Sequence, residues 1–192
     1  ENSSKAWAAA YEPPAVKKGV LVKEQIHHDR PAGMQGFAFN TRRELFSDPQ
    51  VRHALAYAFN FEWSNKALFY GQYERTRSYF QNSEMAATGL PGPDEMKLLE
   101  PFRADLPPEV FTQEYNPPKG DEGGNIRSNL RTASKLLTEA GWVIKDGKRI
   151  NAKTGKPFAF EMLLVSPLFE RIALPFAKNL EKLGIAMTVR TI

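Results

Sequence analysis

The sequence has 192 residues, of which 42% are hydrophobic and 25% are charged, and its 26 Lys and Arg against 22 Asp and Glu give a net charge of +4. These proportions are typical of a globular protein with one domain or two small ones, and they exclude a disordered tail. The absence of cysteine excludes disulfide scaffolds, thiolate zinc centres, iron–sulfur clusters and thiol nucleophiles. No stretch of the sequence approaches the about 18 apolar residues of a membrane helix.

The first part of the chain predicts a connector followed by two strands. Residues 1–19 contain a short helical pattern at positions 6–11 that Pro13-Pro14 should end. The apolar runs at 20–26 and 36–40 predict strands, and the second run is expected to be buried on both faces.

Two capped helices give the clearest local signals. Asp48 is a suitable N-cap, and Pro49 suits the first helical position, where its missing N–H costs nothing. The apolar residues at helical spacing after this cap are Val51, Ala54, Leu55, Ala58 and Phe59. Asn60 is expected to cap a second helix over residues 61–70, with Gly71 as the left-handed residue after its end.

Residues 72–126 are rich in proline and contain a glycine cluster at 120–124. They predict a long ordered loop with one short helix at Asp94–Leu99. A loop of this length in a compact domain is usually functional or rests on a partner surface.

The C-terminal part predicts alternating helices and strands. A helix from Ser128 should end at Gly141, and its apolar face is formed by Leu130, Ala133, Leu136, Leu137 and Ala140. Asp146-Gly147 predicts a type I′ hairpin with positive φ at both residues. Strands at 158–165 and 185–192 flank a helix that begins after Ser166-Pro167, should be kinked by Pro175 and ends at Gly184. This order favours an α/β fold with a mixed sheet flanked by helices.

None of the candidate motifs for catalysis or metal binding is complete, and no cofactor is expected. His27-His28-Asp29 has metal-ligand side chains, but adjacent strand residues point to opposite faces. His53 lies off the apolar stripe of its helix and should be at the surface. Lys153-Thr154-Gly155 matches one motif of penicillin-binding enzymes, but no serine has a lysine three positions later, so a turn is the better interpretation. The glycine cluster carries Asp121 and Glu122, which would repel a phosphate.

The basic residues do not predict a nucleic-acid interface, because Lys17-Lys18, Arg42-Arg43 and the Lys145–Arg149 stretch lie in unrelated elements. Lys145 and Arg149 are expected as polar surface residues of the hairpin. A stronger binding signal is the segment 70–80, in which aromatic residues alternate with arginines outside any periodic element. Such side chains suit an amphipathic ligand with a carboxylate. The alternative is that the aromatic rings only attach the loop to the core.

Three ordered blocks resemble a known family. Gly36–Thr41 is followed by Phe46–Ala58, which contains the pattern Asp-x-x-Val-Arg-x-Ala-Leu-x-x-Ala. The second block is Ala133–Trp142, and the third runs from Leu163-Leu164 to Leu180–Ile185. Together they resemble the extracellular solute-binding protein family 5, the oligopeptide-, dipeptide- and nickel-binding components of ABC transporters. Residues 61–63 and 75–82 are similar to its subgroup of microcin C and oligopeptide binders.

The resemblance implies one lobe of a two-lobed periplasmic binding protein, with residues 1–19 as an inter-lobe connector and 20–192 as most of the second lobe. It implies a periplasmic, non-catalytic protein that captures peptides or peptide-like solutes between its lobes and delivers them to a membrane permease. The chain itself is expected to be a monomeric fragment. The expected ligand-binding residues are Asn40, Arg75, Arg77, Tyr79 and Phe80. The alternatives left open are an α/β enzyme with an unrecognised site and a nucleic-acid-binding module.

Overall fold

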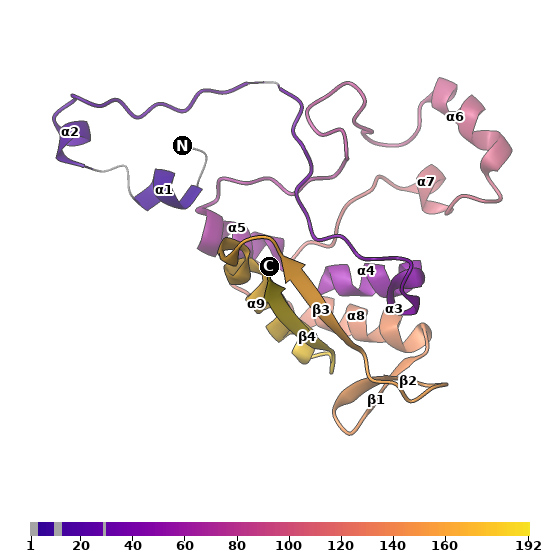
Figure 1. Cartoon of the computed structure of the whole chain (residues 1–192). Helices are drawn as coiled ribbons and strands as arrows, with labels where there is room; N and C mark the ends of the chain where they lie inside the picture. Colours follow the sequence, from indigo (N-terminus) through magenta and orange to yellow (C-terminus); the bar gives the residue numbers. More distant parts are fainter. Residues whose placement is uncertain (1–3, 10–12, 29) are drawn as a thin grey trace. The chain divides into compact units, whose positions relative to one another are not determined.

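The structure is a computed structural model, and it describes residues 4–9, 13–28 and 30–192. The chain divides into two compact units, of which unit 1 comprises residues 1–21, 38–73 and 118–192 and unit 2 comprises residues 22–37 and 74–117. The four described strands and the buried apolar cluster belong to unit 1, whereas unit 2 consists of short helices and irregular segments (Figure 1).

Unit 1 begins with two short helices, α1 (Ser4–Ala9) and α2 (Pro14–Lys17). The helical pattern expected at 6–11 is confirmed as far as Ala9, and its last two positions lie outside the described residues. Pro14 occupies the first turn of α2, where a proline costs no hydrogen bond. The connector role of residues 1–19 stays a prediction.

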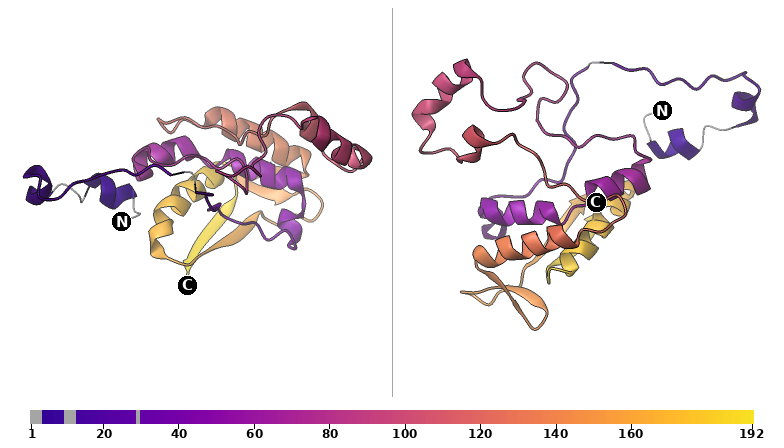
Figure 2. Two further views of the ribbon diagram at one scale, coloured as in Figure 1. Left: turned by 90° about the horizontal axis from the view of Figure 1, so that it is seen from above. Right: turned by 180° about the vertical axis from the view of Figure 1, so that it is seen from behind.

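The core of unit 1 is built on α4 (Pro49–Tyr57) and α8 (Arg127–Glu139), which lie side by side (Figures 1 and 2). The short helix α3 (Glu44–Ser47) leads into α4, and the Asp48 side chain caps α4 by accepting a hydrogen bond of 2.8 Å from the Gln50 N–H. The apolar faces predicted for the two helices are confirmed. Their fully buried members are Val51, Ala54 and Leu55 on α4, and Ala133 and Leu137 on α8.

The second capped helix is also confirmed. The Asn60 side chain accepts a hydrogen bond from the Trp63 N–H at 3.2 Å, and α5 (Phe61–Phe69) follows. Its left-handed end comes one residue earlier than predicted, because Tyr70 already has a φ of 58° and Gly71 follows with a φ of 73°.

The hairpin predicted at Asp146-Gly147 is formed by β1 (Trp142–Lys145) and β2 (Lys148–Asn151), which pair antiparallel. Asp146 and Gly147 have φ angles of 50° and 75°, as a type I′ turn requires. The hairpin continues into the next strand through the Phe158 N–H, which donates to the Arg149 carbonyl at 2.8 Å.

The second sheet consists of β3 (Ala159–Leu164) and β4 (Ala186–Thr191), which pair parallel in the register Ala159 with Ala186. The two strands are joined by a short 3-10 helix, η2 (Pro167–Phe169), and by α9 (Glu170–Glu181), which packs against β4. Pro175 lies inside α9, which continues as one helix across it. The α/β class is therefore confirmed, with the described strands arranged in two separate sheets.

The expectation that Arg149 is a surface residue of the hairpin is wrong. Its side chain is only 1% exposed, and Nε donates to the Leu183 carbonyl at 3.0 Å while Nη1 donates to the Trp142 carbonyl at 3.1 Å. Nη2 donates to the Ser134 hydroxyl at 2.9 Å. Strand β2 points Arg149 to the place where the C-terminal ends of α8 and α9 converge, and the partial negative charge of helix ends favours a cation there. Burial lowers the pKa of the guanidinium, which nevertheless stays protonated.

Gly184 allows the hairpin to approach the end of α9. Its φ is 77°, and a Cβ at this position would lie 2.7 Å from the Arg149 backbone nitrogen. The Arg149 N–H donates to the Gly184 carbonyl at 2.8 Å. Gly184, which was predicted only to end a helix, is therefore also required for the hairpin to pack closely against the end of α9.

Unit 2 contains α6 (Pro93–Leu99), the 3-10 helix η1 (Glu100–Phe102) and α7 (Glu109–Thr112). The first confirms the predicted short helix, and the sequence did not predict the other two. The two segments of unit 2 are joined by a hydrogen bond of 2.9 Å from the Ala32 N–H to the Gln81 carbonyl.

The strands predicted at 20–26 and 36–40 are not formed. Val20, Val22 and Ile26 are 75%, 84% and 78% exposed, and no strand in the described part of the chain pairs with either run. An apolar run becomes a strand only when a neighbour satisfies its backbone groups. The second run is not buried on both faces either, since only Phe39 packs against the core, with its ring 5.1 Å from that of Phe46.

Candidate functional site

The structure divides the predicted ligand-binding residues between the two units. Asn40 belongs to unit 1, where it is exposed and its Oδ1 accepts a hydrogen bond from the Arg42 N–H at 3.2 Å. Arg75, Arg77, Tyr79 and Phe80 belong to unit 2 and lie on one irregular segment. Four of the five residues are neighbours in the sequence, and the structure places Asn40 in the other unit.

That stretch is ordered by local hydrogen bonds. The Phe80 N–H donates to the Ser78 hydroxyl at 3.1 Å, and the Ser83 N–H and hydroxyl both donate to the Phe80 carbonyl, at 3.1 and 2.7 Å. Asn82 has a φ of 58°, a left-handed conformation that asparagine tolerates better than most residues. These turns fix the backbone that carries Tyr79 and Phe80.

Arg77 is half-exposed and is partly neutralised by Glu114. The Nη1 atom of Arg77 lies 3.8 Å from a carboxylate oxygen of Glu114, and the two side chains are 53% and 48% exposed. An ion pair this exposed is weak, of the order of 0–1 kcal/mol. A ligand carboxylate that binds Arg77 in a bidentate manner would replace it at little cost.

The aromatic residues of the segment 70–80 do not share one role. Tyr79 is 79% exposed and Phe80 is 51% exposed, so neither ring attaches the segment to the core. Tyr73 does have this role, since its ring centroid lies 4.6 Å from that of Phe69. Besides Phe37, unit 2 exposes Phe102 and Tyr115, which the sequence analysis missed. Their isolated positions in proline-rich sequence gave no periodic signal.

The unit 1 residues on both sides of the segment 74–117 are bound to α5 and to its N-cap Asn60. At the first end, the Asn65 side chain accepts from the Tyr73 N–H at 3.0 Å and donates to the Tyr73 carbonyl at 2.7 Å. At the second end, the Gly120 N–H donates to a Glu62 carboxylate oxygen at 2.6 Å, and the Asn60 side-chain amide donates to the Asp121 carbonyl at 2.9 Å.

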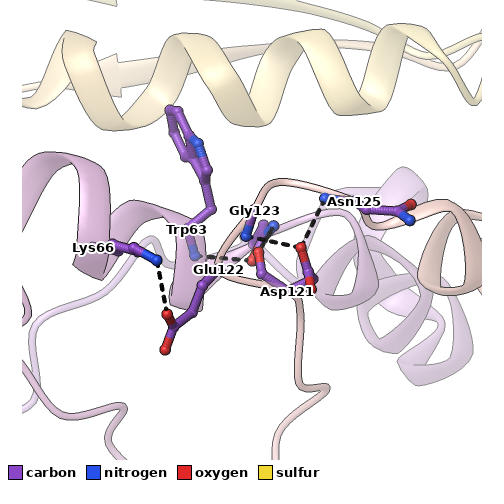
Figure 3. Close-up of polar contacts among 7 residues, drawn as sticks. Trp63, Lys66, Asp121, Glu122, Gly123 and Asn125 are labelled. Carbon is purple, nitrogen blue, oxygen red and sulfur yellow. Dashed lines mark hydrogen bonds and ion pairs between the residues drawn. The ribbon is translucent and has the colours of Figure 1, made fainter.

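The acidic glycine-rich turn continues this second attachment. Lys66 forms an ion pair of 3.2 Å with Glu122, and Asp121 Oδ1 accepts from the Gly123 and Asn125 N–H groups at 2.8 and 3.3 Å (Figure 3). The turn therefore uses its own carboxylate to satisfy the backbone donors that would otherwise face an anion. That this turn does not bind phosphate stays a prediction.

Other sequence candidates give no site. In the described part of the chain, which leaves out Asp29, no group of three or more potential metal ligands comes together. His53 is exposed, as predicted, and Lys153-Thr154-Gly155 forms a turn in which the Lys153 and Thr154 N–H groups donate to Asn151 Oδ1, both at 3.0 Å. Among the helices that the structure describes, none has the length and apolar character needed to cross a bilayer.

A cavity of about 310 Å³ lies in unit 1 between α3, the first turn of α4 and the hairpin. Its lining includes Glu44, Asp48 and Trp142, but none of the five predicted ligand-binding residues. The volume is at the lower limit of about 300 Å³ for pockets that enclose small molecules. The cavity and the predicted site are therefore different places.

Comparison with known proteins gives a consistent result. Residues 2–192 match the family model described as bacterial extracellular solute-binding proteins, family 5 Middle. The chain is 46% identical over 192 residues to the uncharacterized protein YejA of Escherichia coli (strain K12), covering 100% of this chain and 32% of that protein. It is 44% identical over 194 residues to the probable peptide-binding protein YejA of Agrobacterium fabrum, again covering 100% of this chain and 32% of that protein.

The fold is shared with a solved structure. The oligopeptide-binding protein AppA of Bacillus subtilis, in complex with a nonapeptide, matches with a TM-score of 0.54 and 24% identity over 80% of this chain and 25% of that one. At this identity the likeness concerns the fold alone. The chain spans about a third of the length of the curated relatives that it matches.

Proposed function

Because the chain belongs to family 5 of the bacterial extracellular solute-binding proteins, we propose that the full-length protein is the substrate-binding component of an ABC importer for peptides or peptide-like solutes. The observation that carries the proposal is the match of residues 2–192 to the family model. The ligand class is supported by the names of a relative from Agrobacterium fabrum and of a structural neighbour from Bacillus subtilis, both of which refer to peptides.

The proposed role is binding, with no covalent chemistry. A peptide offers a backbone, a terminal carboxylate and side chains of varied size. Guanidinium groups pair with carboxylates in a bidentate manner, and exposed aromatic rings stack on apolar side chains without requiring one sequence. Arg77, Tyr79 and Phe80 are the residues of unit 2 that we assign to these contacts, and Arg75 and Asn40 complete the proposed set.

We place the protein in the periplasm, where it would deliver its ligand to the permease subunits of the transporter. Energy for transport would come from the partner ATPase. The family description as extracellular solute-binding proteins supports this location.

The assignment of Tyr79 and Arg77 can be tested in the full-length protein. We expect Tyr79→Ala and Arg77→Ala each to weaken the binding of a peptide from a synthetic pentapeptide library by about 5- to 30-fold, because a stacked aromatic pair and a charge-assisted hydrogen bond are each worth about 1–2 kcal/mol. Isothermal titration calorimetry measures the change.

The matched control is Tyr70→Ala, which removes an exposed tyrosine from the same part of the sequence but outside unit 2. It should leave the affinity unchanged. Equal affinities for wild type and both test variants would contradict the assignment of this segment, and a wild-type protein that binds no peptide of the library would contradict the proposed ligand class.

A further inference from the structure

We propose that α5 acts as a clasp at the base of the segment 74–117, and that Asn65 and Glu62 hold in position the unit 1 residues that flank this segment, Tyr73 and Gly120. The part of this inference that concerns ligand affinity rests on the proposed function, because the segment carries four of the five assigned ligand-binding residues. The part that concerns the order of the segment stands on the contacts alone.

The first end is held by a two-point contact. The Asn65 amide group satisfies both backbone groups of Tyr73, accepting from its N–H at 3.0 Å and donating to its carbonyl at 2.7 Å. A side-chain amide that bonds both backbone groups of one residue fixes the orientation of that residue as well as its position. The Tyr73 ring adds a contact with Phe69 at the end of the same helix, with centroids 4.6 Å apart.

The second end is held by a set of contacts from the same helix. Glu62 accepts the 2.6 Å hydrogen bond from the Gly120 N–H, and Asn60 donates to the Asp121 carbonyl. Lys66 pairs with Glu122 (Figure 3). On the neighbouring helix α8, the Asn129 side chain donates to the Lys119 carbonyl at 3.0 Å.

Two glycines permit this close approach. A Cβ at position 120 would collide with the Asn60 amide and would lie 3.0 Å from Glu62 Oε2. Gly124 has a φ of 90°, and a Cβ there would lie 3.3 Å from the Trp63 indole. The glycine cluster, which the sequence placed in a long ordered loop, is therefore the place where the backbone fits against α5.

The two attachments lie on one face of the helix. Glu62 and Asn65 are three residues apart, a spacing that makes them neighbours on a helix surface and separates them by about 4.5 Å along its axis. The side chains that bind Tyr73 and Gly120 therefore start from positions less than one helical turn apart on α5. The segment 74–117 is a loop closed at its base by two side chains.

The helix that holds this base is itself anchored in unit 1. Asn60 and Ser64 are buried, and the Ser64 hydroxyl donates to the Asn60 carbonyl at 2.9 Å. Near its other end, Arg171 of α9 donates to the Leu68 carbonyl at 3.5 Å and lies 5.7 Å from the centre of the Phe69 ring. The clasp residues thus extend from a fixed support, and their loss should loosen the segment without loosening the core.

The test compares Asn65→Ala, Glu62→Ala and the double variant with wild type in the full-length protein. Hydrogen–deuterium exchange followed by mass spectrometry reports on peptides from residues 74–117, and thermal unfolding reports on the whole protein. We expect exchange in this segment to rise at least tenfold in the double variant and peptide affinity, measured with the pentapeptide library, to fall by a similar factor. The matched control is Asn179→Ala, which removes a similar half-buried amide of α9 that donates to the Ala58 carbonyl at 3.0 Å and is not one of the residues bonded to Tyr73 or Gly120.

A conservative variant of Glu62 distinguishes a positioning role of its side chain from a general loss of stability. Glu62→Gln keeps a side-chain oxygen that can accept from the Gly120 N–H and should therefore retain wild-type exchange, whereas Glu62→Ala should not. The inference would be overturned by unchanged exchange in the double variant, by an equal rise in Asn179→Ala, or by faster exchange with unaltered affinity. If wild type binds no peptide, the proposed function fails, and the exchange result still decides whether α5 clasps the segment.

Discussion

Replacement of Arg149 by alanine is expected to lower the free energy of unfolding by about 3–5 kcal/mol, because the change removes a buried cation and leaves its acceptors without donors. Two of these acceptors are the carbonyls of Leu183 and Trp142, at 3.0 and 3.1 Å from the guanidinium. A buried carbonyl that loses its partner costs about 1–3 kcal/mol, and the space left by the side chain adds a cavity term. Urea denaturation followed by circular dichroism measures the loss.

Two further variants serve as comparisons in this experiment. Arg149→Lys retains the charge but not the planar arrangement of donors, so it should recover only part of the stability. Arg190→Ala removes an arginine whose ion pair with Glu161, at 3.0 Å, is about half exposed, and it should cost less than about 1 kcal/mol. If Arg149→Ala proved as mild as Arg190→Ala, the buried network would not contribute to stability as we argue.

The second large effect is expected for Leu137→Ala, with a loss of about 2–5 kcal/mol in the free energy of unfolding. Leu137 is fully buried in the interface between α4 and α8, where its removal leaves a cavity that two packed helices cannot close. The same denaturation measurement applies. The matched control is Leu163→Ala, because Leu163 is 52% exposed on β3 and should cost about 1 kcal/mol or less. A loss below about 0.5 kcal/mol for Leu137→Ala would contradict the assignment of this helix face.

Features that depend on a few neighbouring residues were predictable from the sequence. Asp48 and Asn60 cap their helices as expected, because a capping side chain and the backbone N–H group that donates to it lie within three residues of each other. The turn at Asp146-Gly147 follows equally from local backbone preferences. In each case the physical cause is contained in the segment itself.

Features that depend on distant partners were not predictable. The apolar run at 20–26 has strand-like composition, but composition does not supply the neighbouring strand that would pair with it. Arg149 resembles an ordinary hairpin residue, and only the convergence of two helix ends explains its burial. Of the candidate site, the sequence indicated the segment with Arg77 and Tyr79 through its mixture of aromatic residues and arginines.

The attachments of that segment gave no sequence signal. Asn65 and Glu62 look like ordinary surface residues of a helix, and their partners lie 8 and 58 positions away. The glycines at 120 and 124 were recognised as a cluster, but their role as contact points with α5 depends on the tertiary structure. The roles of these two side chains and of the two glycines can be assigned only when the position of α5 is known.

The closed base of the segment 74–117 has a consequence for how this protein can diversify. The entropic cost of closing a flexible loop grows only with the logarithm of its length, so that doubling the loop costs about 0.6 kcal/mol. Insertions and deletions between the two attachment points therefore leave the core of unit 1 almost undisturbed, provided that Asn65 and Glu62 keep their partners. Evolution can therefore change the length and sequence of this segment while the scaffold that carries it stays constant.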